Sequence, residues 1–574
     1  LSDGDGGTSA NYNTTVTVTA VNDAPAFSNL NGTPTFTEGG AAVVLDANVQ
    51  IFDAELSALN NFNGATLTLA RNGGANAEDV FSGSGTLSLT SGNVVVSGTT
   101  IGTYTNSGGT LQFTLNASAT NTLVNSAMQQ IAYSNSSDAP PASAQINWTF
   151  SDGNSGGQGS GGALTATGST TVTITEVNDA PTITNLSGDS LSYNEGAGAV
   201  VIEQGANALV ADIDSSNFDT GTLTVSIPSG GDSAEDVLSI RNQGTGAGQI
   251  GVSGSSVTYG GVTIGTFIGG STGTNLVITL NSSATPTAVT ALVKNITYEN
   301  TDTAAPTTGA RTVRYVLSDG DGGTSANYNT TVTVSAVNDA PTMTNLSGDS
   351  LSYSEGAGAV VIEQGANVLV TDPDSANFDT GTLTVSVPTG GDSAEDVLSI
   401  QNQGTGVGQI GVSSSTVTYE SVSIGTFTGG SNGSNLVITF NNSATPTAIT
   451  ALVKHITYEN TDTNAPTTGA RTVRYVLTDG DGGTSANYDT TVTVIAANDA
   501  PVNTVPGAQM VTENMVLAIG GISIADVDGN LNTVQLTVGN GILNVTLSGA
   551  ASISAGSNGS NTLTLSGSQI DINA

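Results

Sequence analysis

The residues of this sequence best suited to chemistry are its carboxylates. Asp and Glu number 47 against 8 Lys and Arg, which gives a formal net charge of −39, and the chain has one His and no Cys. Calcium takes six to eight oxygen ligands from carboxylates and carbonyls, whereas softer metals prefer the thiolate and imidazole groups that are nearly missing here. The composition therefore favours a hard cation such as Ca²⁺, with a solvated acidic surface as the alternative.

The acids recur in a fixed order, and most stand in segments rich in Gly, Asn, Asp and Ser, which predict loops. The strand-like segments between these loops carry almost no charge. We therefore expect the acids to concentrate at the two ends of each folded repeat. In one copy the order is Glu355, Asp372, Asp374, Glu459, Asp462, Asn498 and Asp499.

The string Asn-Asp-Ala-Pro marks the period of an array. It begins at residues 22, 178, 338 and 498, so successive copies start 156, 160 and 160 residues apart. We expect both ends of the sequence to be cut from a longer polypeptide. The segments predicted are the closing strands of a preceding repeat in 1–21, a diverged repeat in 22–177, two close copies in 178–337 and 338–497, and a partial fourth repeat in 498–574.

Apolar and polar residues alternate between the acidic loops. Segments such as 221–227, 275–280 and 330–335 follow the period of two that is typical of half-buried strands. One stretch, 284–293, has apolar residues at helical spacing with Pro286 near its start, which predicts a short helix. The expected fold class is all-β: a tandem array of Ig-like β-sandwich repeats of about 160 residues that forms an elongated rod.

This architecture determines where the acids lie. Loops of a sandwich alternate between a leading end, where the chain enters the repeat, and a trailing end, where it leaves. The early Glu and the late acidic loop fall at the trailing end, and the Asp-x-Asp motif falls at the leading end of the following repeat. One junction would therefore gather Glu195, Glu299, Asp302, Asn338, Asp339, Asp372 and Asp374.

An early Glu, an Asp-x-Asp motif and an Asn-Asp-Ala-Pro linker together resemble the cadherin calcium-binding pattern. With Val before the Asn, at 21–25, 177–181 and 337–341, the linker is similar to that of bacterial cadherin-like tandem repeats in giant secreted surface adhesins and extracellular fibres. The fourth copy has Ala497 at that place. The resemblance implies cadherin-like sandwiches with Ca²⁺ between them, bound by Asn178, Asp179, Glu195, Asp212, Asp214, Glu299, Asp302, Asn338, Asp339, Glu355, Asp372, Asp374, Glu459, Asp462, Asn498, Asp499, Asp526 and Asp528.

Two sets of acids leave alternatives open. The first repeat has Asp53-Ala-Glu55 for the early pair and Asn135-Ser-Ser-Asp138 for the late loop, so we expect it to bind fewer ions. The Asp-Gly-Asp-Gly-Gly loops, such as 319–323, are either further ligands or tight turns, and turns are the commoner use of such sequences. They are not EF-hands, because the twelfth position is Thr330 instead of Glu.

Catalysis is not expected. The single histidine, His455, stands where the preceding copy has Asn295, so it is interpreted as incidental. The single tryptophan, Trp148, aligns with Tyr315 and is interpreted as a core residue, which leaves no aromatic platform for a glycosidase cleft. The sequence therefore predicts a protein that is not an enzyme.

The function expected is structural: an extracellular, secreted rod or filament stiffened by calcium, such as a cell-surface fibre, an adhesin stalk or a matrix component. Nucleic acid and membrane insertion are excluded as partners of this segment, because its charge repels phosphates and no stretch is apolar enough to span a bilayer. Self-association into fibres, or contact with neighbouring repeats of the same polypeptide, is expected. The alternatives are an adhesive module that binds glycan or another surface, and a polymer joined by donor-strand complementation.

Overall fold

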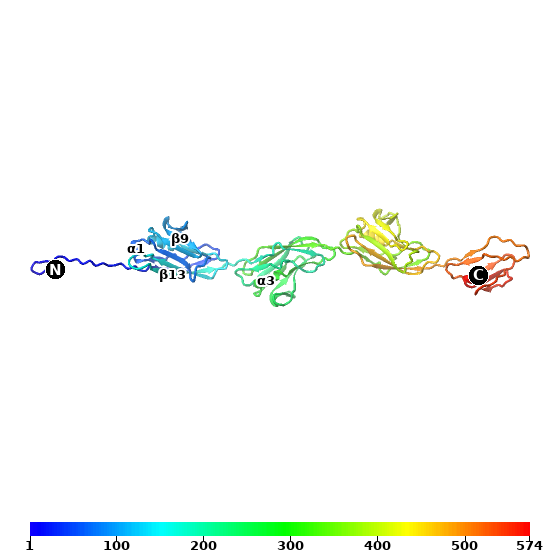
Figure 1. Cartoon of the computed structure of the whole chain (residues 1–574), viewed down its shortest axis with the longest axis horizontal. Coiled ribbons are helices and arrows are strands. Elements are labelled where there is room, and N and C mark those ends of the chain that lie inside the picture. Colours follow the sequence, from blue (N-terminus) through cyan, green and yellow to red (C-terminus); the bar gives the residue numbers. More distant parts are fainter. The chain divides into compact units, whose positions relative to one another are not determined.

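The computed structural model describes all residues, Leu1–Ala574, and is almost entirely β-structure. The chain divides into two units, one of residues 1–301 with 307–335 and the other of residues 302–306 with 336–574. Each unit contains β-sandwiches built to one plan (Figure 1). The expected all-β fold class of repeated sandwiches is confirmed.

The repeat that follows Asn178 shows the plan. An eight-stranded sheet has the spatial order β15 (Ser190–Asn194), β26 (Tyr328–Ser335), β25 (Gly309–Ser318), β18 (Thr222–Ser229), β23 (Leu276–Leu280), β22 (Val262–Ile268), β21 (Ser256–Tyr259) and β20 (Ile250–Ser253). A three-stranded sheet has the order β16 (Val200–Val201), β24 (Ile296–Asn300) and β19 (Asp236–Ile240). A short ribbon pairs β14 (Thr182–Thr184) with β17 (Leu209–Ala211).

The repeat that follows Asn338 repeats this order. Its large sheet is β28 (Ser350–Ser354), β39 (Tyr488–Ile495), β38 (Gly469–Leu477), β31 (Thr382–Thr389), β36 (Leu436–Phe440), β35 (Val422–Thr428), β34 (Thr416–Tyr419) and β33 (Ile410–Ser413). Its small sheet is β29 (Val360–Val361), β37 (Ile456–Asn460) and β32 (Asp396–Ile400), and its ribbon is β27 (Thr342–Thr344) with β30 (Leu369–Thr371).

The repeat that follows Asn22 has the same three sheets. The large one is β2 (Thr35–Thr37), β13 (Thr165–Thr175), β12 (Ser143–Ser151), β5 (Thr66–Arg71), β10 (Thr110–Leu115), β9 (Thr99–Ser107), β8 (Asn93–Val96) and β7 (Leu87–Thr90). The small one is β3 (Val43–Val44), β11 (Ile131–Asn135) and β6 (Asp79–Gly83), and the ribbon is β1 (Ala26–Ser28) with β4 (Gln50–Phe52).

The two terminal segments have fewer strands. After Asn498 the chain forms β40 (Val502–Thr504) with β41 (Ser523–Ala525), a sheet of β42 (Thr533–Thr537), β44 (Thr562–Ser566) and β43 (Ser552–Ala555), and the helix α5 (Gln569–Asn573). Residues 1–20 are exposed and form no named strand, with one isolated bridge between Ser2 and Thr8.

Alternation of burial explains why these segments are strands. Along β25, Val313, Tyr315 and Leu317 face the core while the residues between them are half-buried, which is the period of two of a sheet with one covered face. β15 lies parallel to β26, with Leu191 opposite Val332, so the first long strand and the last strand of a repeat are neighbours. The ends of the repeat are therefore held together by one strand pair.

Short helices close one side of each sandwich. They are α1 (Ala54–Leu59), α2 (Asn121–Met128), α3 (Pro286–Val293) and α4 (Pro446–Val453). In α3, Thr285 caps the first turn, Pro286 occupies the start, and Val289, Leu292 and Val293 are buried. The helix predicted within 284–293 is confirmed.

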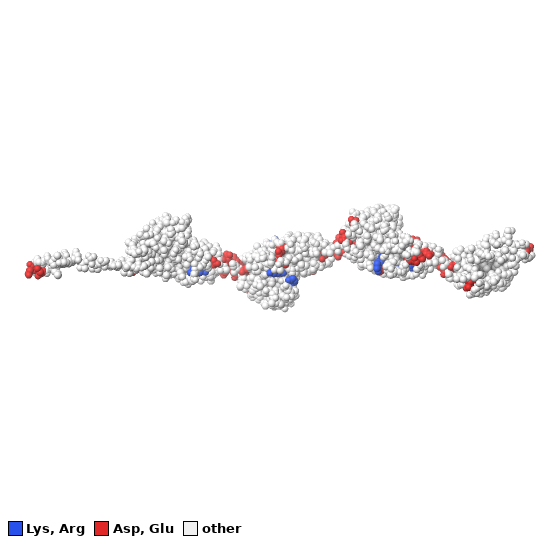
Figure 2. All heavy atoms as spheres, in the orientation of Figure 1, with Lys and Arg blue, Asp and Glu red and all other residues white.

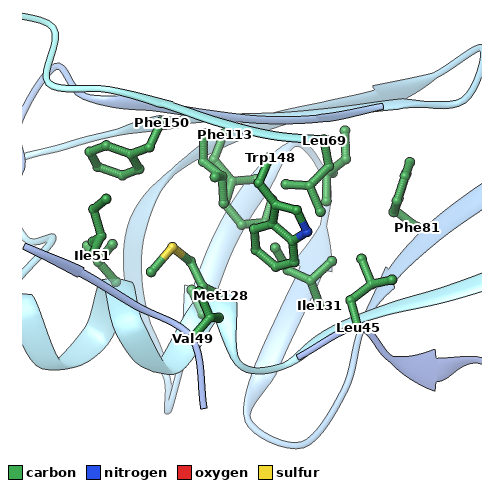
Figure 3. Close-up of a cluster of buried hydrophobic side chains, with 14 of the residues drawn as sticks. Leu45, Val49, Ile51, Leu69, Phe81, Phe113, Met128, Ile131, Trp148 and Phe150 are labelled. Carbon is green, nitrogen blue, oxygen red and sulfur yellow. The ribbon is translucent and has the colours of Figure 1, made fainter. Parts of the chain in front are cut away.

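The aromatic core agrees with the sequence prediction. Trp148 is fully buried, and Figure 3 shows it among Leu69, Phe113, Met128 and Ile131. His455 is half-buried beyond the end of α4, where its Nδ1 lies 2.7 Å from the Ala451 carbonyl oxygen, so it completes a helix end. The helices of this chain are all too short to cross a lipid bilayer.

Candidate cation sites at the ends of the repeats

Each Asn-Asp-Ala-Pro linker makes the same backbone contact at the leading end of its repeat. The N–H of the linker Asp donates to the second acid of the Asp-x-Asp motif, or to the Glu that replaces it in the first repeat. A hydrogen bond to a carboxylate is short and directional, so it fixes where the linker meets the sandwich. The contacts are Asp23 to Glu55 Oε2 at 3.3 Å, Asp179 to Asp214 Oδ2 at 2.8 Å, Asp339 to Asp374 Oδ2 at 3.1 Å and Asp499 to Asp528 Oδ2 at 2.5 Å.

The Asp-x-Asp motif folds back on itself and leaves oxygens without hydrogen-bond partners. Asp212 Oδ1 accepts from the N–H of Asp214 at 3.4 Å and of Ser215 at 3.0 Å. This turn leaves Asp212 Oδ2 buried with no donor, and Asp214 Oδ1 and Asp179 Oδ2 share that condition. A buried carboxylate oxygen without a donor is costly, so a positive charge would stabilise this leading end.

The later leading ends repeat this arrangement. Asp372 Oδ1 accepts from Asp374 at 3.3 Å, and both Asp372 Oδ2 and Asp339 Oδ2 are buried without a partner. In the last copy the N–H of Asp528 donates to Asp526 Oδ1 at 3.2 Å, and Asp499 Oδ2 is the buried oxygen without a partner. The motif therefore gives the same polar environment each time it occurs.

Electrostatics within the motif follow from this burial. Burial, with the neighbouring Asp214 adding to it, raises the pKa of Asp212 to about 6. Burial alone would raise the pKa of Asp214 too, but hydrogen bonds from Asp212 and from the Asp179 N–H outweigh it and lower that pKa. Burial likewise raises the pKa of Asp372 to about 6, with Asp374 as its neighbour. Below about pH 6 the two carboxyl groups of a motif therefore hold one proton between them, and above that pH both are charged.

The Asp-Gly-Asp-Gly-Gly loop is a tight turn that supports the linker. Asp319 is fully buried, and its Oδ1 accepts from the N–H groups of Asp321, Gly322 and Gly323 at 2.8 to 3.0 Å. Its Oδ2 accepts from Asn178 Nδ2 at 2.9 Å. Of the two alternatives that the sequence left open, the structure gives the turn.

Only glycine fits at the end of this loop. A Cβ on Gly323 would overlap Asp319 Oδ2 and lie 2.6 Å from the Asp179 carbonyl oxygen. Asn338 and Asp479 make the equivalent bond at 2.8 Å, and Asn22 and Asp152 make it at 2.7 Å. The linker Asn is thus held by the loop, and these aspartates belong to the leading end although the sequence did not place them there.

The early Glu lies at the trailing end, where the chain leaves its repeat. Glu355 Oε2 accepts from the N–H of Ala497 at 2.8 Å, while its Oε1 is buried without a partner. Glu38 Oε2 accepts from the N–H of Val177 at 2.9 Å in the first repeat. Sequence reasoning missed Glu38, although its Glu-Gly dipeptide and its place after the first alternating strand match those of Glu195 and Glu355.

Glu299 and Glu459 stand beside tyrosines of the early strands. The Tyr193 hydroxyl donates to the carbonyl oxygen of Asn300, the residue after Glu299, at 3.3 Å, which brings this strand end close to the strand that leads to Glu195. Burial raises the pKa of Tyr193, and the charge of Glu299 adds to this. Glu459 acts in the same way on Tyr353. These glutamates therefore share the trailing end with the early Glu of their own repeat.

The late aspartates are held within their own turns. Asp302 Oδ1 accepts from the N–H of Ala304 at 2.9 Å and of Ala305 at 3.1 Å, and these bonds lower its pKa. Asp462 makes the same turn with Asn464 and Ala465. In the second unit an open hollow is lined by Thr303, Ala304, Asp339, Ala340, Thr342, Thr371, Asp372 and Pro373.

The sequence predicted that seven residues meet at one junction, and the structure brings four of them together within one unit. Asn338, Asp339, Asp372 and Asp374 lie together at one leading end. Glu195 and Glu299 belong to the first unit and those residues to the second, so their meeting stays a prediction. No group of three or more His, Cys, Asp or Glu side chains is gathered closely enough to hold a metal ion by itself.

The donor set nevertheless fits a hard cation. The groups at the leading ends are carboxylate, amide and carbonyl oxygens, and the buried carboxylate oxygens there have no donor. Calcium accepts such ligands in irregular geometry and completes its shell with carbonyls and water. In the view of Figure 2 the acidic side chains gather mainly at the narrow ends of the sandwiches, while their broad faces are largely uncharged.

The first repeat has fewer of the acids that make up this site. Asp53 caps α1, its Oδ1 accepting from Glu55 and Leu56, and its Oδ2 is buried without a partner. In the late loop, Asn135 turns inward and donates to Asp79 Oδ1 at 3.2 Å, while Asp138 is exposed. The smaller number of ions expected here stays a prediction.

Comparison with known proteins finds similar solved structures, all at low sequence identity. No family model matches the chain, and no curated protein matches it. Among solved structures, it is similar to mouse cadherin-23 EC22-24, at 14% identity over 83% of this chain and 100% of that one, with a TM-score of 0.28. Human CDH23 EC21-23 is 13% identical over 82% of this chain and 100% of that one, with a TM-score of 0.25. The human desmocollin-1 ectodomain is 12% identical over 95% and 74%, with a TM-score of 0.21. At these values the fold assignment rests on the chain's own sheets.

Proposed function

We propose that this chain is part of a structural extracellular repeat protein whose leading ends bind calcium and so stiffen it into a rod or filament. The observation that carries the proposal is the recurring leading end, where the linker Asp donates to an Asp-x-Asp motif and at least one carboxylate oxygen of the linker or the motif is buried without a donor. The resemblance to bacterial cadherin-like repeats supports a cell-surface fibre, an adhesin stalk or a matrix component as the setting.

The mechanism is electrostatic and mechanical. Without a cation, the charged carboxylates of Asp212 and Asp214 repel one another, and burial and their proximity raise the pKa of Asp212 to about 6. When bound, Ca²⁺ supplies the positive charge that the acids of the leading end lack. Asp179, Asp212 and Asp214 would hold it in one repeat, and Asp339, Asp372 and Asp374 in the next. The hydrogen bonds of the linker N–H groups then fix the direction in which the linker enters the sandwich. Pro181 and Pro341 further restrict the backbone conformation of the linkers.

The setting follows from affinity and charge. Extracellular calcium modules bind at about 10⁻⁴ to 10⁻³ M, so such sites are loaded outside cells and empty in cytosol. The partners are then calcium and other copies or repeats of the same protein, and the chain performs no catalysis. Its formal charge of −39 makes nucleic acid and anionic membrane surfaces unfavourable partners.

The test is thermal unfolding of the whole chain in calcium, in magnesium and in chelator. At a concentration about ten times Kd, each ion adds about 1.4 kcal/mol to the free energy of unfolding. Calcium should raise Tm, and the triple variant D214N/D374N/D528N should lose most of that rise. The matched control D321N/D481N changes exposed acids of the neighbouring loops and should keep it.

Small-angle scattering on the same samples tests stiffness. The maximum dimension should be larger and more uniform in calcium than in chelator. An unchanged Tm and an unchanged maximum dimension would reduce the acids to a solvated surface, and an adhesive or plain spacer role would then be the better account.

A further inference from the structure

The two close copies contain a second set of unpaired oxygens, away from the linkers. Glu203 follows β16 and is only 3% exposed, although it carries a formal charge. Asp189 precedes β15 and is half-buried. Glu363 and Asp349 hold the same positions in the following repeat. No Lys, Arg or His forms an ion pair with any of these four acids.

Each acid is fixed in place but only partly satisfied. Glu203 Oε1 accepts from the N–H of Asn207 at 3.1 Å, while Oε2 is buried with no partner. The Asp189 carbonyl oxygen accepts from Thr331 at 2.9 Å, which holds its loop against β26, and its Oδ2 is buried with no partner. Glu363 and Asp349 repeat these orphaned oxygens. In each of these acids at least one carboxylate oxygen is buried with no hydrogen-bond partner.

A buried phenol faces the same place. Tyr315 in β25 is fully buried, and its hydroxyl has no hydrogen-bond partner. Tyr315 pairs with Tyr328 of β26, and the N–H of Gly188 donates to the Asn329 carbonyl oxygen at 2.9 Å, so Asp189 lies beside the strand that neighbours Tyr315. Burial raises the pKa of Tyr315, and the charges of Glu203 and Asp189 raise it further. Tyr475 has the same environment beside Glu363 and Asp349. Buried tyrosine hydroxyls normally find a partner, so a partner is missing from this cluster.

The carboxyl groups also approach one another. Burial raises the pKa of Glu363, and the neighbouring Asp349 carboxyl adds to this. A single proton shared between the two acids would satisfy them but would leave the phenol oxygen without a partner. A cation satisfies all three oxygens at once, and a divalent one balances both charges.

The first repeat shows what happens when the site is lost. Asp46 takes the place of Glu203, and its Oδ2 accepts from the N–H groups of Asn31 at 2.7 Å and Gly32 at 2.6 Å. The segment that holds Asp189 is one residue shorter there and reads Gly32-Thr33-Pro34, with no acid. Trp148 replaces Tyr315, and its Nε1 donates to Thr170 Oγ1 at 3.1 Å. The first repeat thus lacks the equivalents of Asp189 and of the Tyr315 hydroxyl, and the acid that replaces Glu203 is satisfied by backbone N–H groups.

We propose that Asp189, Glu203 and Tyr315, and likewise Asp349, Glu363 and Tyr475, each form an oxygen-lined site for one divalent cation inside the sandwich. The site is separate from the linker sites, because it uses residues of one repeat alone and does not involve the Asp-x-Asp motif. Its ligands are hard oxygens, which selects calcium or magnesium over zinc and copper. Half-buried Asp189 and Asp349 give the ion a path to solvent.

Ion counting on the whole chain tests the proposal. Equilibrium dialysis against calcium, followed by elemental analysis, should show that E203Q/E363Q loses one bound ion for each of the two repeats. The matched variant D46N should lose none, because amide donors already satisfy that acid. The linker variant D214N/D374N/D528N should keep the internal ions, so a failure of the linker sites and a failure of this one give different counts.

A second readout covers variants that fail to fold. Terbium replaces calcium at oxygen sites and emits when a nearby tyrosine is excited, so Y315F/Y475F should reduce the sensitised emission of the otherwise intact chain. An ion count for E203Q/E363Q equal to that of the unaltered chain, with emission unchanged in Y315F/Y475F, would overturn the site and leave a proton-sharing carboxyl pair.

Discussion

Repeats 22–177 and 178–337 bury the same acid and neutralise it from different strands. In the first, Arg71 of β5 meets Asp79 at 2.5 Å. In the second, Arg311 of β25 meets Asp236 at 3.4 Å, and Ile227 stands where the first repeat has Arg71. Tyr133 and Tyr298 donate to the same two acids. The arginine lies on a different strand in the two repeats, but the buried aspartate forms an ion pair in both.

This contrast separates two kinds of acid in one molecule. Asp236 has an arginine, a tyrosine and an asparagine as donors, which makes it a structural ion pair of the core. Asp212 and Glu203 are partly or fully buried as well, yet each retains an oxygen with no donor. Asp236 therefore has its donors within the protein, whereas Asp212 and Glu203, where we propose a cation, have no base beside them.

The largest effect expected is from breaking the core pair. Arg311→Met leaves Asp236 buried and unpaired, which should lower the free energy of unfolding of that repeat by about 3 to 5 kcal/mol. Hydrogen exchange measured by mass spectrometry reads each repeat separately, so residues 338–497 serve as the reference within the same chain. Equal protection of both repeats would show that the pair contributes little.

A transplant sharpens the same comparison. Moving the base as the first repeat does, with I227R added to R311A, should recover most of the protection that R311A alone removes. The half-buried surface pair Arg474–Asp489, at 2.8 Å, is the control, and R474M should change stability much less than Arg311→Met does. Failure of the transplant would mean that the two arginines are not equivalent.

The next effect is steric. Gly323→Ala places a Cβ against Asp319 Oδ2 and the Asp179 carbonyl oxygen, so the loop must move away from the linker. We expect a loss of about 1 to 3 kcal/mol, as for other overpacked positions. Gly348→Ala is not a matched control, because Gly348 has a positive φ of 91°, which would strain any residue with a Cβ. Gly507→Ala, with open space around it, is the control and should have little effect on Tm, which calorimetry measures.

A smaller effect should change sign with calcium. In chelator, D212N/D372N removes a charge that burial and a neighbouring acid disfavour, so Tm should rise slightly. In calcium the same variant loses a ligand, and Tm should fall relative to the unaltered chain, by the equivalent of about 1 kcal/mol. The exposed acids in D219N/D379N give the matched control, in which neither shift is expected. The same sign in both buffers would exclude Asp212 and Asp372 as ligands.

The smallest effect is a gradual dependence on pH. In chelator the folded chain holds the protons of Asp212 and Asp372 more tightly than the unfolded chain, because their pKa is raised from 3.8 to about 6. Their contribution to stability is therefore present below about pH 4 and is lost as the pH rises through about 6. Denaturant titrations at several pH values should show this decline, and D212N/D372N should flatten it.

Much of the site could be predicted from the sequence because its parts recur. The order of acids, the linker and the alternating strands place the Asp-x-Asp motif in a loop. The linker Asp donates to that motif in three copies and to Glu55, which replaces its second Asp, in the first. Trp148 could be placed in the core because it aligns with a tyrosine inside an alternating strand. These are local patterns, and period and loop chemistry are enough to determine them.

The remainder depends on contacts between distant residues. Asp319 reads as a turn residue, and only the packing of its loop against Asn178 shows that it supports the linker. Glu203 follows a short strand and would be interpreted as a surface acid, because nothing in the local sequence indicates that it is buried. The exchange of Arg71 for Arg311 likewise requires knowing which strands are neighbours in the sheet. Sequence spacing alone gives none of these three.

The parallel pairing of β15 with β26 has a consequence under load. The chain enters near the start of β15 and leaves after the end of β26, so tension applied through the two linkers pulls these neighbours in opposite directions along their length. Five register pairs, from Ser190 opposite Thr331 to Asn194 opposite Ser335, are then sheared together instead of being unzipped one at a time. Each repeat is thus arranged as a tether that yields only when the whole strand pair fails.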